Sequence, residues 1–267
     1  MFQARFQFAT VDLSAFYFDI RKDALYCDAA DAPRRRASRT VLDLLYHRLT
    51  TWLAPMLVFT MEEVWLERFP GEESSVHLQD FPETPQAWRD DALAEDWAKI
   101  RGIRRVVTAA LEIQRTDKVI GASLEAAPVV ELANPALAEL AGRFEMADIC
   151  ITSDLTLKSG PVSPGAFTLE DAGIGVVFEK ARGKKCLRCW KILPDVGLHS
   201  PPFTCARCNA ALGRWSGAER SGGAVFFESA QGQKSDWTIP AYCRPNSKGW
   251  VSSFKQHWRA FLSDLAG

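Results

Sequence analysis

The sequence predicts a mainly α-helical protein in which a helical region precedes a small α+β domain and a four-cysteine finger. Three observations predict this fold class. Apolar residues recur at three- and four-residue steps in several stretches of the first 117 residues. From residue 118 the apolar segments become short and are separated by Gly, Pro and Asn. Two Cys-x-x-Cys pairs follow between residues 186 and 208.

Composition restricts the class of protein. With 267 residues, 47% of them hydrophobic, the chain can bury the core of one large domain or of two to three small ones. The longest weakly polar run, residues 49–61, is too short to span a membrane. The first thirty residues show no export signal, so we expect no membrane partner. Because the net charge is −1, any nucleic acid must be met by local basic patches.

Cysteine usage indicates the compartment. Seven cysteines is an odd number, and four of them have the spacing of metal ligands. This pattern fits a reducing, cytoplasmic location better than a disulfide framework. We interpret the other three, Cys27, Cys150 and Cys243, as isolated thiols.

Residues 12–26 predict the first helix. Asp12 and Ser14 are candidate N-caps, and apolar positions follow near helical spacing as far as Ile20 and beyond. The aromatic cluster Phe16–Phe18 is interpreted as core packing rather than as a platform for stacking bases, because its flanks are not basic.

Residues 34–68 predict two helices, with Pro55 bending or ending the first. Thr60 and Glu63 form a candidate capping box for the second. Positive charge at a helix start opposes the macrodipole, so the arginines before the first helix do not stabilise that helix. They are equally well explained by contact with a phosphate partner and by a solvated surface. The apolar positions are Val41, Leu45, Leu49, Trp52 and Met56, and the arginines are Arg34, Arg35, Arg36 and Arg39.

Residues 70–90 are rich in Pro, Gly, Glu and Ser and predict a loop, after which a long helix is expected over 90–117. Its expected apolar face is Leu93, Trp97, Ile100, Val107 and Leu111. Four arginines share an arc of about 100° beside that face. A solvated face explains them as often as not, but phosphate contact is the sharper hypothesis because like charges repel without a partner. They are Arg101, Arg104, Arg105 and Arg115.

Short apolar segments beyond residue 118 suggest the small α+β domain, with Pro135 to Arg143 as its helix. Gly173 and Gly175 lack the third glycine of a dinucleotide site, so we interpret them as a turn before a strand. The apolar segments are Ser123–Leu124, Val129–Leu132, Asp148–Thr152 and Gly175–Phe178.

The two cysteine pairs predict a metal centre. Fifteen residues separate Cys189 from Cys205, a separation typical of four-cysteine zinc sites. Four thiolates complete the tetrahedron that Zn²⁺ prefers and leave no position for a substrate water, so the metal is expected to be structural. Rubredoxin-like iron and thiols without a metal are the alternatives. The expected ligands are Cys186, Cys189, Cys205 and Cys208.

The surroundings of these cysteines are basic. Eight Lys or Arg residues and a single acidic residue, Asp195, lie between residues 180 and 214. The segment stays positive after four thiolates and a divalent metal ion are counted, which favours an anionic partner. Trp190 is either a lid over the metal or a stacking surface for a base, and packing is slightly favoured.

Several segments together resemble the C-terminal region of bacterial isoleucyl-tRNA synthetase. They are DLSAFYFDIRKDALYCD, RRRASRTVLDLLYHRLTTWLAPMLVFTMEEVW, WAKIRGIRRVVTAALEIQRTDKVIGASLEA and the motif CLRCW with CARC, and they cover residues 5 to 212. The helical part is similar to the bundle shared by the valine, leucine and methionine enzymes. IGASLEA and the cysteine finger point to isoleucine.

The resemblance implies a helical anticodon-binding domain over 1–118 that lacks the family's first helices, an α+β domain over 119–179, a zinc finger over 180–213 and an unassigned extension over 214–267. It implies tRNA(Ile) as partner and one structural Zn²⁺ on the four cysteines. The basic positions around Trp190, which are Lys184, Lys185, Arg188 and Lys191, match the family's RNA-facing surface. Arg101, Arg104 and Arg105 are candidates from helix geometry.

The catalytic half of that family has no counterpart in this chain. The His-x-Gly-His and Lys-Met-Ser-Lys-Ser signatures that hold ATP are absent, so ATP and aminoacylation are expected only in a catalytic half outside this chain, and a separately encoded catalytic half is one expected partner. No catalytic residue is therefore predicted. A stand-alone zinc-containing RNA-binding module and a non-functional fragment are the alternatives. Weak signs of a strand at 224–227 and of a helix at 251–265 remain beyond the finger.

Overall fold

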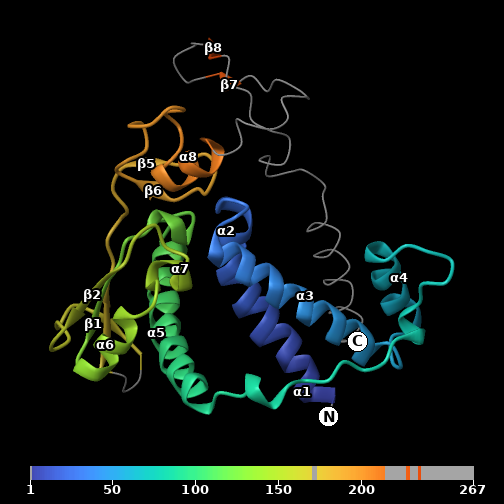
Figure 1. Cartoon of the computed structure of the whole chain (residues 1–267). Helices are drawn as coiled ribbons and strands as arrows, with labels where there is room; N and C mark the ends of the chain where they lie inside the picture. Colours follow the sequence, from blue (N-terminus) through green and yellow to red (C-terminus); the bar gives the residue numbers. More distant parts are fainter. Residues whose placement is uncertain (1, 170–172, 214–226, 229–233, 236–267) are drawn as a thin grey trace. The chain divides into compact units, whose positions relative to one another are not determined.

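A computed structural model describes residues 2–169, 173–213, 227–228 and 234–235 (Figure 1). The chain divides into two compact units, one of residues 30–99 and one that joins residues 1–29 to the chain from residue 100 onward. A mostly helical first part, a small mixed sheet and a buried cysteine cluster confirm the predicted fold class. The domain boundaries expected from sequence stay predictions.

The unit of residues 30–99 is a helical hairpin. Helices α3 (Pro33–Leu53) and α4 (Val58–Arg68) are separated at Pro55, as predicted. Two 3₁₀ turns follow, η2 (Val76–Leu78) and η3 (Gln86–Trp88).

The core of this unit lies where α4 meets α3 and the first 3₁₀ turn. Trp65 stacks on Tyr46, whose hydroxyl donates to the Val64 carbonyl oxygen at 2.5 Å. The capping box predicted at Thr60 and Glu63 is wrong, because α4 begins after Leu57 and has no side-chain cap. The buried residues are Ala54, Met61, Trp65 and Val76.

The other unit begins with a continuous helical run. It consists of α1 (Phe2–Gln7), a π-helical stretch η1 (Phe8–Phe18) and α2 (Asp19–Cys27). The helix predicted over 12–26 therefore begins too late. Asp12 and Ser14 are not N-caps, because the residues before them are already helical and their backbone N–H groups need no cap.

Helix α5 (Asp91–Thr116) crosses the boundary between the two units. The Asp90 carboxylate accepts the Leu93 N–H at 2.9 Å and caps the start of the helix. Ile100, Val107 and Leu111 are buried, which confirms most of the predicted apolar face, and Ile103 is buried beside them. Leu93 does not belong to that face, because 47% of it is exposed.

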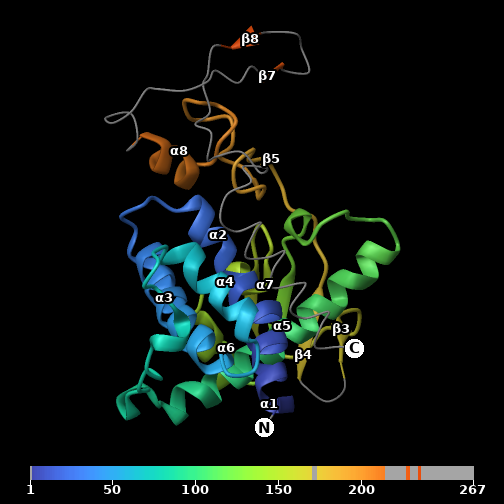
Figure 2. The ribbon, with the colours of Figure 1, turned by 90° about the vertical axis from the view of Figure 1, so that its right-hand side faces the viewer.

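The small α+β part contains a four-stranded sheet with the order β2-β1-β4-β3. The central strand β1 runs parallel to β2 and antiparallel to β4. Strand β3 lies beside β4 at the edge of the sheet (Figure 2). Helix α6 packs on β1 and β2, and α7 lies against α2 (Figure 1). The strands are β1 (Val129–Leu132), β2 (Thr156–Ser159), β3 (Phe167–Thr168) and β4 (Ile174–Val177), and the helices are α6 (Pro135–Gly142) and α7 (Met146–Cys150).

Two of the four apolar segments are strands, β1 and β4, and two are not. Asp148–Thr152 falls mainly in helix α7, and Ser123–Leu124 belongs to the 3₁₀ turn η4 (Ser123–Glu125). Short apolar runs fit a buried helix as well as a strand, which explains the difference. Gly173, with φ of +54°, makes the predicted turn before a strand.

The cysteine-rich segment contains a short hairpin, β5 (Lys184–Lys185) with β6 (Ile192–Leu193), and helix α8 (Ala206–Gly213). Beyond it, only the strand pair β7 (Phe227–Glu228) and β8 (Lys234–Ser235) is described. Cys243 and the helix expected at 251–265 lie outside the described residues, as does most of the strand expected at 224–227. No helix in the described part combines the length and apolar character needed to cross a membrane.

Candidate metal centre and nucleic-acid interface

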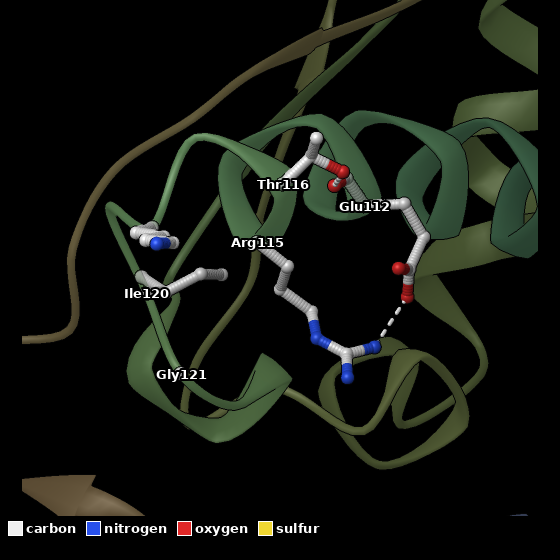
Figure 3. A pocket seen from close by; sticks show the side chains of 6 residues that line it. Glu112, Arg115, Thr116, Ile120 and Gly121 are labelled. Carbon is white, nitrogen blue, oxygen red and sulfur yellow. Dashed lines mark hydrogen bonds and ion pairs between the residues drawn. The ribbon is translucent and has the colours of Figure 1, made fainter.

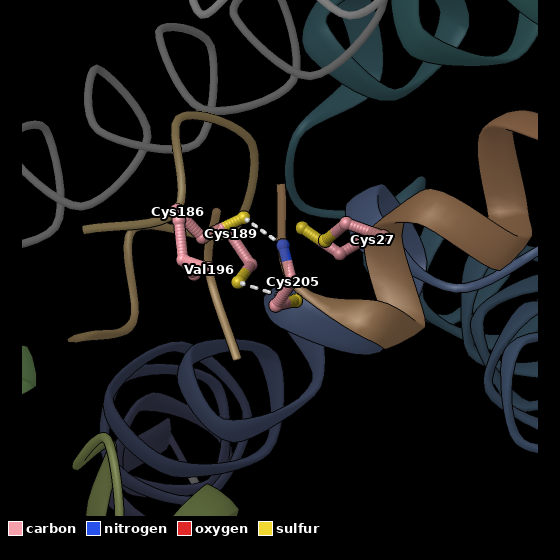
Figure 4. Packing of buried hydrophobic residues seen from close by; sticks show 6 residues of the cluster. Cys27, Cys186, Cys189, Val196 and Cys205 are labelled. Atoms are coloured by element: carbon pink, nitrogen blue, oxygen red, sulfur yellow. Dashed lines mark hydrogen bonds between the residues drawn. The ribbon is translucent and has the colours of Figure 1, made fainter. Parts of the chain in front are cut away.

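The four predicted cysteines converge on one buried point. Their sulfur atoms all lie within 4.8 Å of one another, and Cys186 and Cys208 have no exposed surface. Figure 4 shows Cys186 and Cys189 of one segment and Cys205 of another directed toward one another. The structure therefore brings together the ligand set expected from the spacing.

The first cysteine pair lies on the β5-β6 hairpin. The Cys186 N–H donates to the Lys191 carbonyl at 2.8 Å, and the Trp190 N–H donates to the Cys186 carbonyl at 2.9 Å. Trp190 has a φ of +67°, which turns the chain back after the second cysteine. At Gly183, with φ of +118°, a Cβ would lie 2.2 Å from the Leu193 carbonyl oxygen, so only glycine fits the entry to the hairpin.

The second cysteine pair lies at the start of α8. The Cys205 N–H donates to the Cys186 sulfur at 3.4 Å and so joins the two pairs. The Asp195 carboxylate accepts the Ala206 N–H at 2.6 Å and caps the helix. The single acidic residue counted in the basic segment thus has a structural role.

The chemistry of the donor set fits Zn²⁺. Hydrogen bonds from the thiols of Cys189, Cys205 and Cys208 lower the pKa of Cys186. The pKa values of these three donors are raised, because each holds its proton in a hydrogen bond to the Cys186 sulfur. A divalent cation removes this competition, because it can hold all four sulfurs as thiolates. Four protein ligands leave no open position, so the site is suited to a structural metal rather than to a catalytic one.

A fifth cysteine, which the sequence interpretation treated as isolated, lies beside this centre. Cys27, the last residue of α2, is 4% exposed and packs in the same buried cluster as the four predicted ligands (Figure 4). Its sulfur lies 3.7 Å from the Arg188 carbonyl oxygen. No sequence signal connects it with the finger, because 158 residues separate it from Cys186. Cys150 is also buried, and burial raises its pKa to about 12.

The lysines of β5 and the neighbouring tryptophan form an exposed basic surface. Lys184 and Lys185 are exposed, and 49% of Trp190 is exposed. The Lys185 ammonium lies 5.5 Å from the centre of the Trp190 ring. Within the described residues neither lysine has a carboxylate partner. Both Lys185 and Trp190 line a cavity of about 200 Å³ together with Lys180, Leu124, Glu125 and Ile192.

Two other predicted RNA contacts of the finger have intramolecular partners. The Lys191 ammonium lies 2.5 Å from the Asp148 carboxylate, and only 13% of the lysine side chain is exposed. The Arg188 guanidinium donates to the carbonyl oxygens of Tyr26 and Cys27. Their role in RNA binding stays a prediction.

The arginines of α5 differ among themselves. Arg101 pairs with Asp12 at 2.6 Å and lies over the Phe16 ring. Arg104 pairs with Asp19 at 3.3 Å and donates to the Ile149 carbonyl at 2.9 Å. Arg105 is exposed and has no ion pair among the described residues.

Arg115, the fourth arginine of the stripe, borders an open basin at the end of α5. It pairs with Glu112 at 2.5 Å, and Ile120 and Gly121 form the opposite wall (Figure 3). The basin has a volume of about 460 Å³ and is also lined by Thr116 and Lys118. Its open shape and internal ion pair do not identify a ligand.

Comparison with protein families gives two matches at these places. Residues 1–131 match the anticodon-binding domain of tRNA ligase, and residues 183–210 match the zinc finger found in FPG and IleRS. The second match includes all four clustered cysteines.

Individual relatives agree with both matches. The chain is 65% identical over 214 residues to the isoleucine–tRNA ligase of Ruegeria pomeroyi, a match that covers 80% of this chain and 22% of that protein. It is 52% identical over 212 residues to the enzyme of Brucella abortus, with 79% and 22% covered, and 54% identical over 205 residues to that of Mesorhizobium japonicum, with 75% and 20% covered. The chain thus spans about a fifth of the length of these relatives.

Proposed function

This chain carries the C-terminal anticodon-binding domain and zinc finger of isoleucine–tRNA ligase, and on that premise we propose that it binds tRNA(Ile) near the anticodon. Binding would support the ATP-dependent attachment of isoleucine to tRNA. We assign that reaction to the part of the ligase that this chain does not match, about four fifths of the relatives' length. Reduced metal-binding thiols suit the cytoplasm, where this reaction is expected to occur.

The observation that carries the proposal is the surface formed by Lys184, Lys185 and Trp190. A half-exposed indole provides an apolar face on which an unstacked base can lie. The Lys185 ammonium beside the ring and the ammonium of Lys184, both without a carboxylate partner in the described part of the chain, attract the phosphates of the same nucleotides. The anticodon loop is single-stranded and presents such bases. The adjoining cavity of about 200 Å³ adds a recess next to the ring.

Other basic residues have a different part in the proposal. The guanidinium groups of Arg101 and Arg104 are occupied by carboxylates, so we assign them to holding the helices together. Lys191 does the same for the finger through Asp148. Arg105 is exposed and remains a candidate for phosphate contact.

Zinc has a structural role in the proposal. Cys186, Cys189, Cys205 and Cys208 would hold one Zn²⁺, which supplies the free energy that folds the finger. The hairpin carrying Lys184 and Lys185 continues directly into the first ligand, so metal binding orders the RNA-facing surface. No catalytic step is assigned to the metal.

The test is binding of the zinc-loaded chain to tRNA(Ile) and tRNA(Val) at several salt concentrations. We expect tighter binding of tRNA(Ile) and an affinity that falls as salt rises, because neutralised phosphates release counterions. Equal affinity for the two tRNAs contradicts the specificity. An affinity that does not depend on salt contradicts the phosphate contacts.

A further inference from the structure

Each cysteine pair of the finger contains one arginine between its two ligands. Arg188 lies between Cys186 and Cys189, and Arg207 lies between Cys205 and Cys208. Both side chains reach the C-terminal half of helix α2, between Asp23 and the residue that follows the helix, Asp28. Two arginines on separate segments of the finger therefore converge on one helix end about 160 to 185 residues earlier in the chain.

Arg207 makes the stronger of the two attachments. Its guanidinium donates to both oxygens of the Asp23 carboxylate, at 2.5 and 2.9 Å, and to an Asp28 oxygen at 3.3 Å. Only 7% of the Asp28 side chain and 25% of the Asp23 side chain are exposed. A bidentate, partly buried pair of this kind has a fixed geometry and is stronger than an exposed ion pair.

Arg188 binds the backbone end of the same helix. It donates to the carbonyl oxygen of Cys27 and, at 3.0 Å, to that of Tyr26. The last carbonyl groups of a helix lack partners within the helix and carry the negative end of its dipole. A guanidinium at this position satisfies both carbonyl groups and stabilises the helix end.

Packing completes the contact. The Cys27 side chain, at the end of α2, lies among the four clustered cysteines and Val196 in a single buried cluster (Figure 4). The end of α2 is thus part of the wall around the metal centre.

We propose that Arg188 and Arg207 are positioning residues that fasten the zinc-loaded finger to the end of helix α2, so that metal binding and docking of the finger are coupled. Each arginine is one or two residues from two ligands, so the metal determines the backbone position from which its side chain starts. Without the metal, the backbone at Arg188 and the backbone at Arg207 are no longer held together. Conversely, loss of the docking removes the wall formed by Cys27 and exposes the centre to water and chelators.

The inference depends on the zinc site of the proposed function but not on tRNA binding. It also assigns Arg188 a contact that differs from the RNA contact expected from sequence. Because Arg188 and Arg207 anchor the finger, the exposed surface of Lys184, Lys185 and Trp190 is held in a defined orientation on the helical part.

The experiment measures zinc release from the full chain after addition of an excess of a chromogenic chelator, 4-(2-pyridylazo)resorcinol. The variants are R207Q and R188Q. R182Q is the matched control, because Arg182 is an exposed arginine of the same basic segment with no ion pair among the described residues. We expect R207Q to release zinc about tenfold faster, as loss of a hydrogen-bonded charge pair predicts, and R188Q severalfold faster. R182Q should stay within about twofold of the unchanged chain.

A variant on the helix side separates docking from damage to the finger. D23N weakens the Arg207 contact without changing a finger residue. It should accelerate zinc release when Arg207 is present, whereas the double variant with R207Q should release zinc at nearly the rate of R207Q alone. Hydrogen exchange provides a second readout. Zinc should slow exchange of the amides of residues 19–28 in the unchanged chain and have a smaller effect in R207Q.

The outcomes distinguish this inference from the proposed function. Equal release rates for R207Q, R188Q and R182Q, with exchange of residues 19–28 unaffected by zinc, overturn the docking role. Failure of the unchanged chain to bind zinc overturns the docking role together with the metal site. Coupling in a chain that does not bind tRNA(Ile) supports the docking role and contradicts only the proposed function.

Discussion

The helical part and the cysteine finger of the same unit obtain their stability differently. Helix α5 buries a row of apolar side chains, among them Ile100, Ile103 and Val107, over several turns. The finger buries four cysteine side chains at one point, together with only a few small or medium-sized residues such as Val196, Thr204 and Ala211. Stabilisation is thus distributed along the helix and concentrated in the finger, so a single substitution should have unequal consequences in the two regions.

Their charges differ in the same way. The α5 arginines Arg101 and Arg104 are matched by aspartates on η1 and α2, whereas Lys184 and Lys185 of the finger have no carboxylate partner among the described residues. The paired arginines Arg101 and Arg104 contribute to folding, whereas Lys184 and Lys185 are available to a partner. Counting charges along the sequence does not separate these two roles.

The largest expected effect is loss of a metal ligand. Cys205→Ser should abolish zinc binding and unfold residues 180–213, because structural zinc in small fingers contributes roughly 10 kcal/mol or more to folding. The helices should remain, since their cores contain no ligand. Metal analysis, circular dichroism and limited proteolysis measure the three quantities.

Cys150→Ser is the matched control for that experiment, because Cys150 is also a buried thiol but lies outside the cluster. It should retain zinc. Identical protease sensitivity of residues 180–213 with and without zinc would show that the metal is not structural.

A smaller effect is expected for an arginine of the helical part. Arg104→Met removes a pair with Asp19 and leaves the Ile149 carbonyl without its donor, which should cost about 2 kcal/mol in the free energy of unfolding. Urea denaturation followed by circular dichroism measures this loss. Arg105→Met, an exposed neighbour, should change the free energy of unfolding by less than about 0.5 kcal/mol. Equal losses for both would remove the distinction between paired and unpaired arginines.

The finger lysines should show the opposite result. The double variant Lys184→Gln and Lys185→Gln should leave stability unchanged and weaken tRNA binding about tenfold, with the slope of affinity against salt reduced by about 2. Gln is neutral and similar in length, so packing is largely retained. An unchanged slope would assign RNA binding to another surface.

Local patterns explain which parts of the fold the sequence predicts. Helices α3, α4 and α5 were predicted closely, because apolar spacing and Pro55 act within a few turns. The spacing of the four cysteines predicted that they cluster, since each cysteine pair is local. Strand β2 gave no signal, because its side chains are mostly exposed and do not form an apolar run.

Long-range partners explain what the sequence does not predict. Arg101 and Asp12 are 89 residues apart, and Arg207 and Asp23 are 184 residues apart. Nothing in the spacing of either pair indicates that they meet. The role of Cys27 was missed for the same reason, because tertiary packing alone brings α2 to the finger.

The smallest expected effect concerns stability against acid, which we expect to depend on a carboxylate of the sheet and not on the metal of the finger. On strand β1, the Glu131 carboxylate accepts the Ser163 backbone N–H at 2.7 Å and the Ser163 hydroxyl at 2.8 Å. The backbone bond, followed by the hydroxyl bond, lowers the pKa of Glu131 from its ordinary value. Because the pKa is lower in the folded protein than in the unfolded chain, this contact stabilises the sheet above the unfolded pKa of about 4.3, and the stabilisation is lost as pH falls through the folded pKa.

Glu131→Gln should therefore lower the urea midpoint slightly at pH 6 and make it less sensitive to pH between about 5 and 3. Measuring both proteins in EDTA removes the metal contribution of the finger, so any remaining difference belongs to the sheet. Glu139→Gln, on α6, is the matched control and should keep the acid sensitivity of the unchanged chain. A steep acid dependence that survives in Glu131→Gln would contradict the role of Glu131 in the acid sensitivity of the sheet.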